Sequence, residues 1–195
     1  MNNILYVTSF NKKLFDVTGK DMIQSFLGTA IEGDLLVTYE DDIENEIPSS
    51  EKISLLNLET YDFLNDWLEA NRDIIPAEYG GDYKGCECDK LPASEQYNRG
   101  HVQRCPNMGF NRRASFWFRK IAAMNYALGL SKEKDYSKIV FVDSDVLFKN
   151  KITEEFINKV FGKSGFFFHL GAHRKRIGTG IESGFIGFSK ESRGF

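Results

Sequence analysis

Apolar runs and amphipathic segments follow one another along the chain, and their periods predict a sheet flanked by helices. Short runs of β-branched and aromatic residues predict strands, and apolar residues three or four positions apart predict helices. Strands are expected at 4–10, 35–39, 53–58, 139–142 and 165–170, with a last one in the second half of 178–188. Strands that alternate with helices are typical of βαβ units, so we expect an α/β fold with at least one parallel crossover.

Four amphipathic segments predict helices. They are expected at 21–30, from 61 to Pro76, at 112–128 and from a cap at Thr153 to Val160. In the third helix, four large apolar side chains share one face that we expect to be buried. These are Trp117, Ile121, Met124 and Leu128. Residues 11–19 are interpreted as a polar connection without a helix.

Two carboxylates follow the most apolar strand directly. The run 139–142 ends in Asp143 and Asp145, with one small residue between them. Ligands bind outside the carboxyl ends of strands in open α/β sheets, and hard oxygen ligands suit Mg²⁺ or Mn²⁺. Apolar residues resume at 146–148, so we expect the pair to be packed and not part of a solvated loop. A metal site is favoured over a simple turn capped by Asp143, because packed carboxylates cost free energy unless a cation meets them.

Length and charge narrow the classes of protein. The chain has 195 residues, 42% of them hydrophobic, which is enough for one domain, expected to span 1–195. Its net charge of −3 argues against nucleic acid as the main partner. No apolar run approaches the ~20 residues of a membrane span, and no signal-like segment opens the chain. Three cysteines do not suggest a secreted disulfide framework, so a cytoplasmic location is expected.

Residues 78–109 have no sustained period and contain several Gly and Pro, so we expect an irregular insertion or a lid. Four possible zinc ligands lie within it, namely Cys86, Cys88, His101 and Cys105. The Cys-x-Cys gap is tighter than in usual zinc sites, so free thiols are favoured over zinc. Recognition of an acceptor is another plausible use of such a loop.

Several basic and histidine side chains are candidates for contact with an anion or a metal. Lys120, on the helix that leads to the acidic strand, is a candidate phosphate contact, with a solvated helix face as the alternative. His169 follows three phenylalanines, so a core residue is favoured over a metal ligand. The basic run 173–176 is interpreted either as a contact with an anionic donor or as a solvated surface turn. Glu182 stands at the entrance of the last strand, and Gly184 permits close approach of a ligand or of another backbone.

Five short motifs occur in the order found in nucleotide-sugar-dependent glycosyltransferases of the GT-A fold, which this chain resembles. They lie at 6–11, 37–41, 118–123, 142–148 and 182–185, and the fourth, Val-Asp-Ser-Asp-Val-Leu-Phe, is similar to the family's DxD motif. The resemblance implies a single Rossmann-related α/β domain with a mixed, mostly parallel sheet flanked by helices. It also implies transfer of a hexosyl or related sugar from a nucleotide-diphosphate sugar, with a UDP-sugar favoured, to a glycan, protein or small-molecule hydroxyl.

The resemblance implies a role for each matching residue. Asp145 would bind Mn²⁺ or Mg²⁺, and Asp143 would contact the ribose or the metal shell. Glu182 would act on the sugar or on the acceptor hydroxyl. Lys120 would neutralise phosphate charge. The residues implied to line the nucleoside pocket are Thr8, Ser9 and Glu40.

The sequence also departs from the family's pattern. Many members have Asn or Asp where this chain has Glu182, so retention or inversion of stereochemistry stays open. A further metal ligand is usual beyond the Ser-Gly strand, whereas this sequence stops at Phe195. We therefore expect a C-terminally truncated domain, the N-terminal part of a longer protein. His169 or His173 could substitute for that ligand, although neither occupies the expected place.

Three other functions are weighed against the transferase. A sugar- or protein-binding module could keep the fold without turnover. A phosphatase of the haloacid dehalogenase type also uses Asp-x-Asp after a strand. Its motif has Thr or Val at the position of Leu147, however, and normally lies near the N-terminus of the chain. A dinucleotide-binding domain is disfavoured because residues 8–11 lack a glycine-rich turn.

Overall fold

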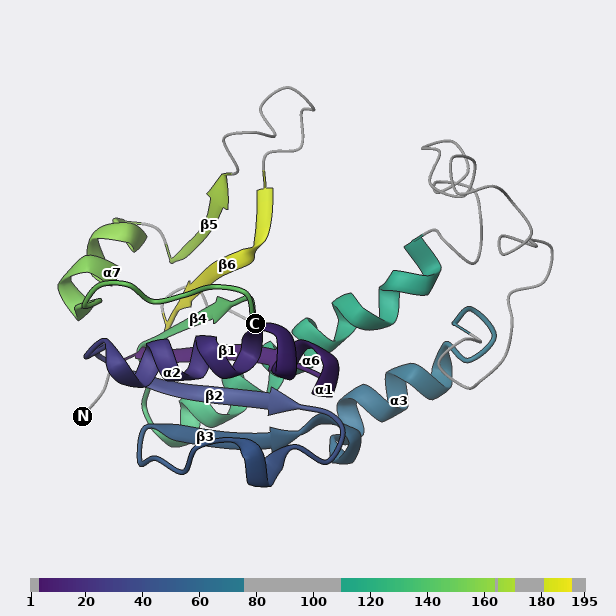
Figure 1. Ribbon diagram of the computed structural model, residues 1–195. Coiled ribbons are helices and arrows are strands. Elements are labelled where there is room, and N and C mark those ends of the chain that lie inside the picture. Colours follow the sequence, from purple (N-terminus) through teal and green to yellow (C-terminus); the bar gives the residue numbers. More distant parts are fainter. Residues whose placement is uncertain (1–3, 76–109, 164, 171–180, 191–195) are drawn as a thin grey trace, which may run out of the picture. The chain divides into compact units, whose positions relative to one another are not determined.

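The computed structural model describes residues 4–75, 110–163, 165–170 and 181–190 (Figure 1). Two compact units make up the chain. The first combines Met1–Leu58 with Ala123–Phe195, and the second is Glu59–Ala122. The expected single domain over 1–195 and the lid at 78–109 stay predictions, since 76–109 lie outside the described residues.

A six-stranded sheet forms the centre of the first unit, with the strand order β3-β2-β1-β4-β6-β5. Its strands are β1 (Ile4–Phe10), β2 (Asp34–Tyr39), β3 (Ile53–Asn57), β4 (Lys138–Val142), β5 (Phe166–Leu170) and β6 (Ile181–Ser189). The strands β1 to β4 are parallel to one another, whereas β6 is antiparallel to both β4 and β5. The predicted mixed, mostly parallel sheet is therefore confirmed.

The helices are α1 (Lys12–Leu14), α2 (Lys20–Gly28), α3 (Asp62–Ala70), α6 (Phe110–Glu133) and α7 (Glu154–Phe161). A π-helix, Phe15–Gly19, joins α1 to α2, and two short 3₁₀ turns lie at Glu44–Glu46 and Leu58–Thr60. The cap predicted for α7 is confirmed, because the Thr153 side chain accepts a hydrogen bond from the Phe156 N–H. In the part of the chain that the structure describes, no helix combines the length and apolarity of a membrane span.

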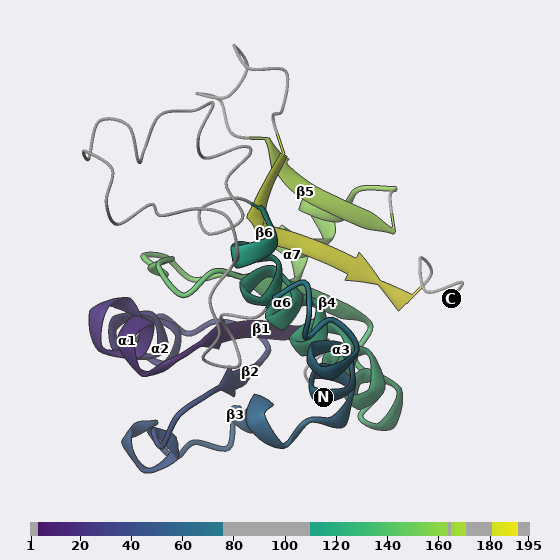
Figure 2. The ribbon, with the colours of Figure 1, turned by 90° about the vertical axis from the view of Figure 1, so that its right-hand side faces the viewer.

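Large aromatic residues fill one face of the sheet, beneath α2 and α7. Figure 2 shows α2 on this side of the sheet. Tyr6 and Phe26 meet edge to face with ring centroids 5.6 Å apart, and both also contact Phe148 edge to face. Alternation along β1 explains this face, since Ile4, Tyr6 and Phe10 point to the same side. Burial of such rings is a main source of the sheet's stability.

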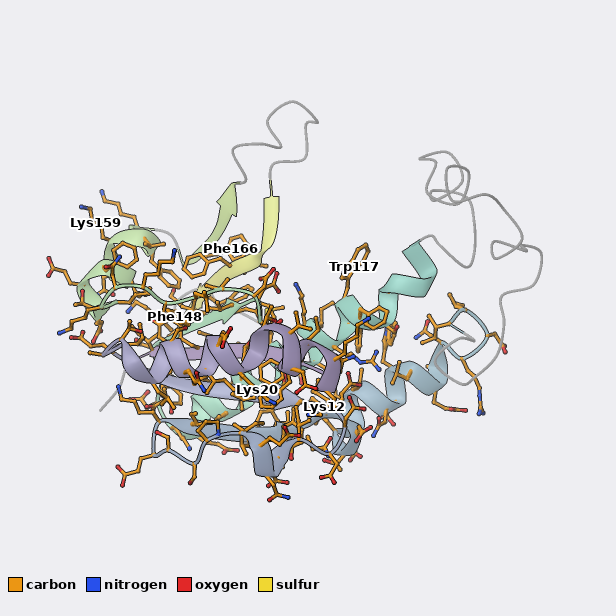
Figure 3. The ribbon with its side chains drawn as sticks, viewed as in Figure 1. Lys12, Lys20, Trp117, Phe148, Lys159 and Phe166 are labelled. Carbon is orange, nitrogen blue, oxygen red and sulfur yellow. The ribbon has the colours of Figure 1, made fainter. Side chains whose placement is uncertain are left out.

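On the opposite face, the C-terminal part of α6 contributes small side chains to the core. Ala123 and Ala127 pack there against Leu5 and Val7 of β1. The prediction for this helix was wrong at two residues: Trp117 and Ile121 are 44% and 47% exposed. Figure 3 shows Trp117 pointing away from the helix. Small residues form the buried stripe because they let a helix approach a sheet closely.

The segment predicted as a polar connection, residues 11–19, is helical instead. Asn11 starts the helix, because its side chain accepts a hydrogen bond from the Leu14 N–H at 3.0 Å. Phe15 is fully buried and packs on Phe10 with ring centroids 5.5 Å apart. One buried aromatic residue and one cap therefore outweigh the polar composition of the segment.

The second unit holds α3 and the N-terminal half of α6. The Phe118 ring lies parallel to Trp67, with centroids 3.9 Å apart, and to Phe63, with centroids 5.6 Å apart. Leu64 is the buried residue of α3. Stacked aromatic rings thus supply much of the packing within this unit.

Candidate functional site

The carboxyl ends of β1 and β4 lie side by side in the middle of the sheet. Residues Ile4–Val7 pair in parallel with Lys138–Phe141. The chain leaves β1 towards α2 on one face, and it enters β4 from α6 on the other face. The strand order therefore reverses between these two strands, and ligands of open α/β sheets bind at such a switch point.

The acidic turn, defined here as Asp143–Val146, follows β4 at this point. The Asp143 N–H donates to the Gly184 carbonyl at 2.9 Å, and the Val146 N–H donates to the Asp143 carbonyl at 3.2 Å. Ser144 is buried and Asp143 is half-buried, whereas Asp145 is exposed. The prediction of a packed pair was therefore wrong for Asp145, because the turn lifts this residue into solvent.

The chain beyond the acidic turn is anchored to α2. Phe148 is buried in the aromatic core, and its N–H donates to the Ser25 hydroxyl at 3.0 Å. Further along, the Glu32 N–H donates to the Ile152 carbonyl at 2.9 Å. Contacts on both sides of the turn thus hold its backbone, which favours a preorganised site.

Gly184 of β6 lies directly beside the Asp143 carboxylate. A methyl group built on Gly184 would lie 2.5 Å from Asp143 Oδ2 and 3.1 Å from Cγ. Real side chains do not approach so closely, so the carboxylate occupies space that only glycine leaves open. The sequence suggested a close approach at Gly184, but it did not identify Asp143 as the neighbour.

The residues expected to line a nucleoside pocket lie at the ends of β1 and β2. Ser9 and Glu40 are half-buried, and the Glu40 N–H donates to the Phe10 carbonyl at 3.2 Å. Thr8 is fully buried, and its hydroxyl has no hydrogen-bond partner in the described part of the chain. Burial argues against direct contact between the Thr8 side chain and a ligand. The three nucleoside roles stay predictions.

Two other predicted site residues are only partly described. Lys120 is half-buried on α6 and belongs to the second unit, so its proximity to the acidic turn stays a prediction. Glu182 is the second residue of β6, where its backbone pairs with His169 of β5. The backbone of Glu182 is therefore two positions from Gly184 on the strand beside β4. The predictions for His173 and for Cys86, Cys88, His101 and Cys105 lie outside the described residues.

The donor set at the acidic turn fits a divalent cation of the magnesium type. Among the described residues, no three His, Cys, Asp or Glu side chains gather into a complete metal cluster. Mg²⁺ and Mn²⁺ commonly bind through one or two carboxylates and complete their shell with water and substrate phosphates. Asp143, held beside Gly184, and the exposed Asp145 match that open arrangement.

A second acidic segment, the β2 loop (residues 40–50), follows β2. Lys12 bonds Glu46 at 2.8 Å and Asp16 at 2.9 Å, and Lys20 bonds the same two carboxylates. The hydrogen bond from Lys12 is the largest cause that holds the pKa of both carboxyl groups below their ordinary values. In the same loop, Asp41 accepts a hydrogen bond from the Lys12 N–H at 2.8 Å.

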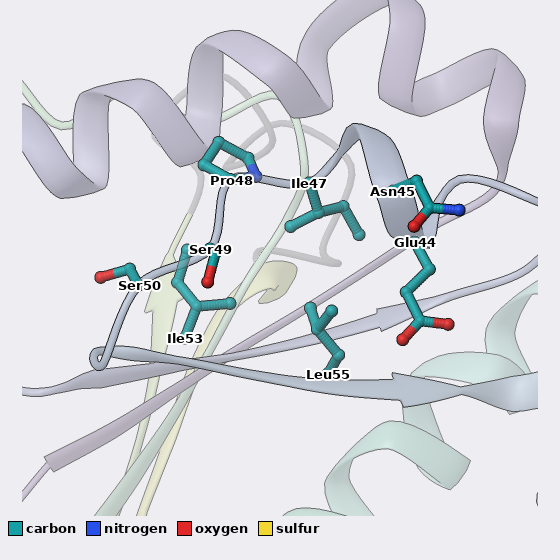
Figure 4. Close-up of a pocket in the computed structure, with 8 residues that line it drawn as sticks. All are labelled: Glu44, Asn45, Ile47, Pro48, Ser49, Ser50, Ile53 and Leu55. Carbon is teal, nitrogen blue, oxygen red and sulfur yellow. The ribbon is translucent and has the colours of Figure 1, made fainter.

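A cavity of about 330 Å³ lies between the β2 loop and the edge strand β3 (Figure 4). Its lining combines polar and apolar side chains. They are Glu44, Asn45, Ile47, Pro48, Ser49, Ser50, Ile53 and Leu55. Two strands, β2 and β1, separate β3 from β4, so this cavity is distinct from the acidic turn.

Comparisons with known proteins give likenesses only among solved structures. No protein-family profile matches the chain, and a search of curated proteins finds no significant match. The apo form of mouse xyloside xylosyltransferase 1 aligns with 97% of the chain and 68% of its own, at 13% identity and a TM-score of 0.48. A putative nucleotide-diphospho-sugar transferase from Desulfovibrio desulfuricans G20 aligns with 98% of the chain and 65% of its own, at 13% identity and a TM-score of 0.38.

The chain thus spans about two thirds of the length of either protein. The activities in these two names belong to those proteins. At this level of identity they assign no role to a residue of the present chain.

Proposed function

We propose that the chain transfers a sugar from a nucleotide-diphosphate sugar to an acceptor hydroxyl. The observation that supports this function best is the acidic turn at the switch point of the sheet. There, the two carboxylates of Asp143 and Asp145 follow β4 directly, beside the end of β1. A ligand-binding crevice at such a switch point is a general property of open α/β sheets.

Asp143 and Asp145 would hold a Mn²⁺ or Mg²⁺ ion together with the diphosphate of the donor. When bound, the ion would offset the negative charge that develops on the departing nucleoside diphosphate. The residues of the chain would provide orientation: Asp143 is held by the backbone bond to Gly184, and Asp145 is exposed towards solvent. Ser9 and Glu40 would contact the nucleoside, and a UDP-sugar is the favoured donor.

Two further residues, Lys120 and Glu182, would contact the donor phosphate and the reacting sugar or acceptor. Lys120 would contact a phosphate oxygen of the donor. Glu182 would accept the proton of the acceptor hydroxyl, or stabilise positive charge on the sugar carbon as its bond to the diphosphate breaks. The acceptor class is open among glycans, proteins and small molecules.

Binding of nucleotides to the purified chain tests the proposal. UDP, GDP, CMP and dTDP would each be titrated by calorimetry with 1 mM Mn²⁺ and with EDTA. One nucleoside diphosphate, expected to be UDP, should bind at least ~10-fold more tightly with Mn²⁺ and should raise the melting temperature. Hydrolysis of the matching nucleotide-sugar would then separate an enzyme from a non-catalytic module. Equal binding of every nucleotide with and without metal would contradict the proposal.

A further inference from the structure

Asp143 has little freedom except at its side chain. Its N–H donates to the Gly184 carbonyl and its carbonyl accepts from the Val146 N–H, at 2.9 and 3.2 Å. Both bonds fix the backbone between β4 and the acidic turn. The direction of the carboxylate then depends on rotation about two side-chain bonds, and the space left by its neighbours limits that rotation.

Gly184 provides that empty space. The methyl group of an alanine at this position would lie 2.5 Å from Oδ2, 3.1 Å from Cγ and 3.5 Å from Cβ of Asp143. The first distance is impossible and the second is tight, whereas the third is an ordinary contact. An added methyl group would therefore displace the carboxylate while it leaves the Asp143 backbone and Cβ in place.

We propose that Gly184 is a positioning residue, which sets the direction of the Asp143 carboxylate for the divalent cation and the nucleotide. This inference rests on the proposed function and deepens it. It explains a glycine in the interior of a strand, where glycine weakens a sheet and needs another reason. The role needs no contact between Gly184 and the ligand, because the residue acts through the carboxylate that it accommodates.

A substitution at Gly184 should separate two properties, the stability of the fold and the metal-dependent affinity for UDP. Gly184→Ala should leave the fold intact, with a melting temperature within about 3 °C of the unchanged chain, because only a side-chain end must move. The Kd for UDP with Mn²⁺ should rise at least ~10-fold, because metal sites tolerate little displacement of a ligand. UDP binding in EDTA should not change. The electron paramagnetic resonance spectrum of Mn²⁺ bound with UDP should also differ from that of the unchanged chain.

Two further variants make the test specific. Gly129→Ala is the matched control, since the methyl group that it adds on α6 meets no described atom within 4 Å beyond its chain neighbours and the helix's own backbone. Its Mn²⁺-dependent binding should equal that of the unchanged chain. If Gly184→Ala does lower the melting temperature strongly, Asp143→Ala in the same chain should restore it, since the clashing atoms are then absent. Destabilisation that persists in this double variant would contradict the steric coupling.

The outcomes distinguish this inference from the proposed function. If the unchanged chain binds UDP with Mn²⁺ and the folded Gly184→Ala variant binds them equally well, only the role of Gly184 is overturned. An unchanged chain with no Mn²⁺-dependent binding of any nucleotide would overturn the proposed function and, with it, this role. A selective loss of the metal-dependent part of the affinity in Gly184→Ala supports both.

Discussion

The acidic turn and the β2 loop both leave the carboxyl end of a parallel strand, and both are rich in carboxylates. In the β2 loop, Asp41 and Glu46 bind Lys12, and Glu44 accepts a hydrogen bond from the Tyr39 hydroxyl at 2.9 Å. Within the described residues, no such contact is seen for the exposed side chain of Asp145 in the acidic turn. The comparison teaches that acidity alone does not mark a site. An exposed carboxylate at the switch point of the sheet, such as Asp145, is the better candidate for a ligand.

The strongest test of this comparison is Asp145→Ala. It should raise the Kd for UDP with Mn²⁺ by about 100-fold or more, because the cation loses a ligand. The melting temperature should hardly change, because the side chain is exposed. Calorimetry and thermal unfolding measure the two quantities. Asp42→Ala, an exposed carboxylate of the β2 loop, is the matched control and should alter neither. Unchanged metal-dependent affinity in folded Asp145→Ala would reverse the assignment.

Glu182→Gln sharpens the comparison by separating donor binding from transfer. The substitution keeps size and hydrogen bonding but removes the charge. It should lower kcat by about 100-fold if the carboxylate acts as a base, with little effect on the donor Kd. Steady-state transfer and calorimetric binding of UDP provide the measurement. A normal kcat would reduce Glu182 to a residue of the β6 strand.

Ser25→Ala tests whether the hydrogen bond from Phe148 to α2 stabilises the acidic turn. It removes the acceptor of the Phe148 N–H, which is partly buried, and an unsatisfied donor there costs about 1–3 kcal/mol. The melting temperature should fall by several degrees. Hydrogen exchange at the Phe148 amide should become faster. Thr38→Val is the control, because it removes a hydrogen bond to the Thr8 carbonyl in the same sheet. In this variant, the Phe148 amide should keep its protection. Equal protection in both variants would show that the turn does not depend on α2.

The smallest effect is expected in the β2 loop itself. The pKa values of Glu46 and Asp16 lie below their ordinary 4.5 and 3.8, so their ion pairs stabilise the fold above these values and lose that effect as the pH falls through the lowered values. At pH 7, Glu46→Gln should lower the melting temperature by no more than about 2 °C, since exposed pairs contribute little. The difference from the unchanged chain should shrink as the pH falls below 4.5 and vanish once Glu46 is protonated. A difference that persists at low pH would exclude this cause.

The strands could be predicted from sequence because buried strands are continuous apolar runs. The strand β1 has the predicted bounds, and β4 lies within one residue of its prediction. The π-helix was missed because one buried ring, Phe15, and the Asn11 cap decide that segment, while most of its residues are polar. Trp117 was misplaced because periodicity favours large residues, whereas the buried stripe of α6 consists of small ones.

The candidate site was only partly predictable. The position of Asp143 and Asp145 after a buried strand is a local feature, which the sequence contains directly. The contact of Asp143 with Gly184 is not local, since it depends on the antiparallel register in which Val142 pairs with Phe185. The anchor from Ser25 to Phe148 joins residues 123 positions apart, and no motif in the sequence indicates it.

The placement of β1 at the centre of the sheet has a consequence for synthesis. Its neighbour β2 follows closely in the sequence, but its other neighbour is β4. Ile4 therefore cannot pair with Lys138 until that distant residue has been synthesised. Ribosomes add about 5–20 residues per second, so roughly 7 to 27 seconds separate the emergence of the two strands. Loop closure over such a distance also slows folding. During that interval one edge of β1 is open to other chains, so slower translation should lose more of this protein to aggregation.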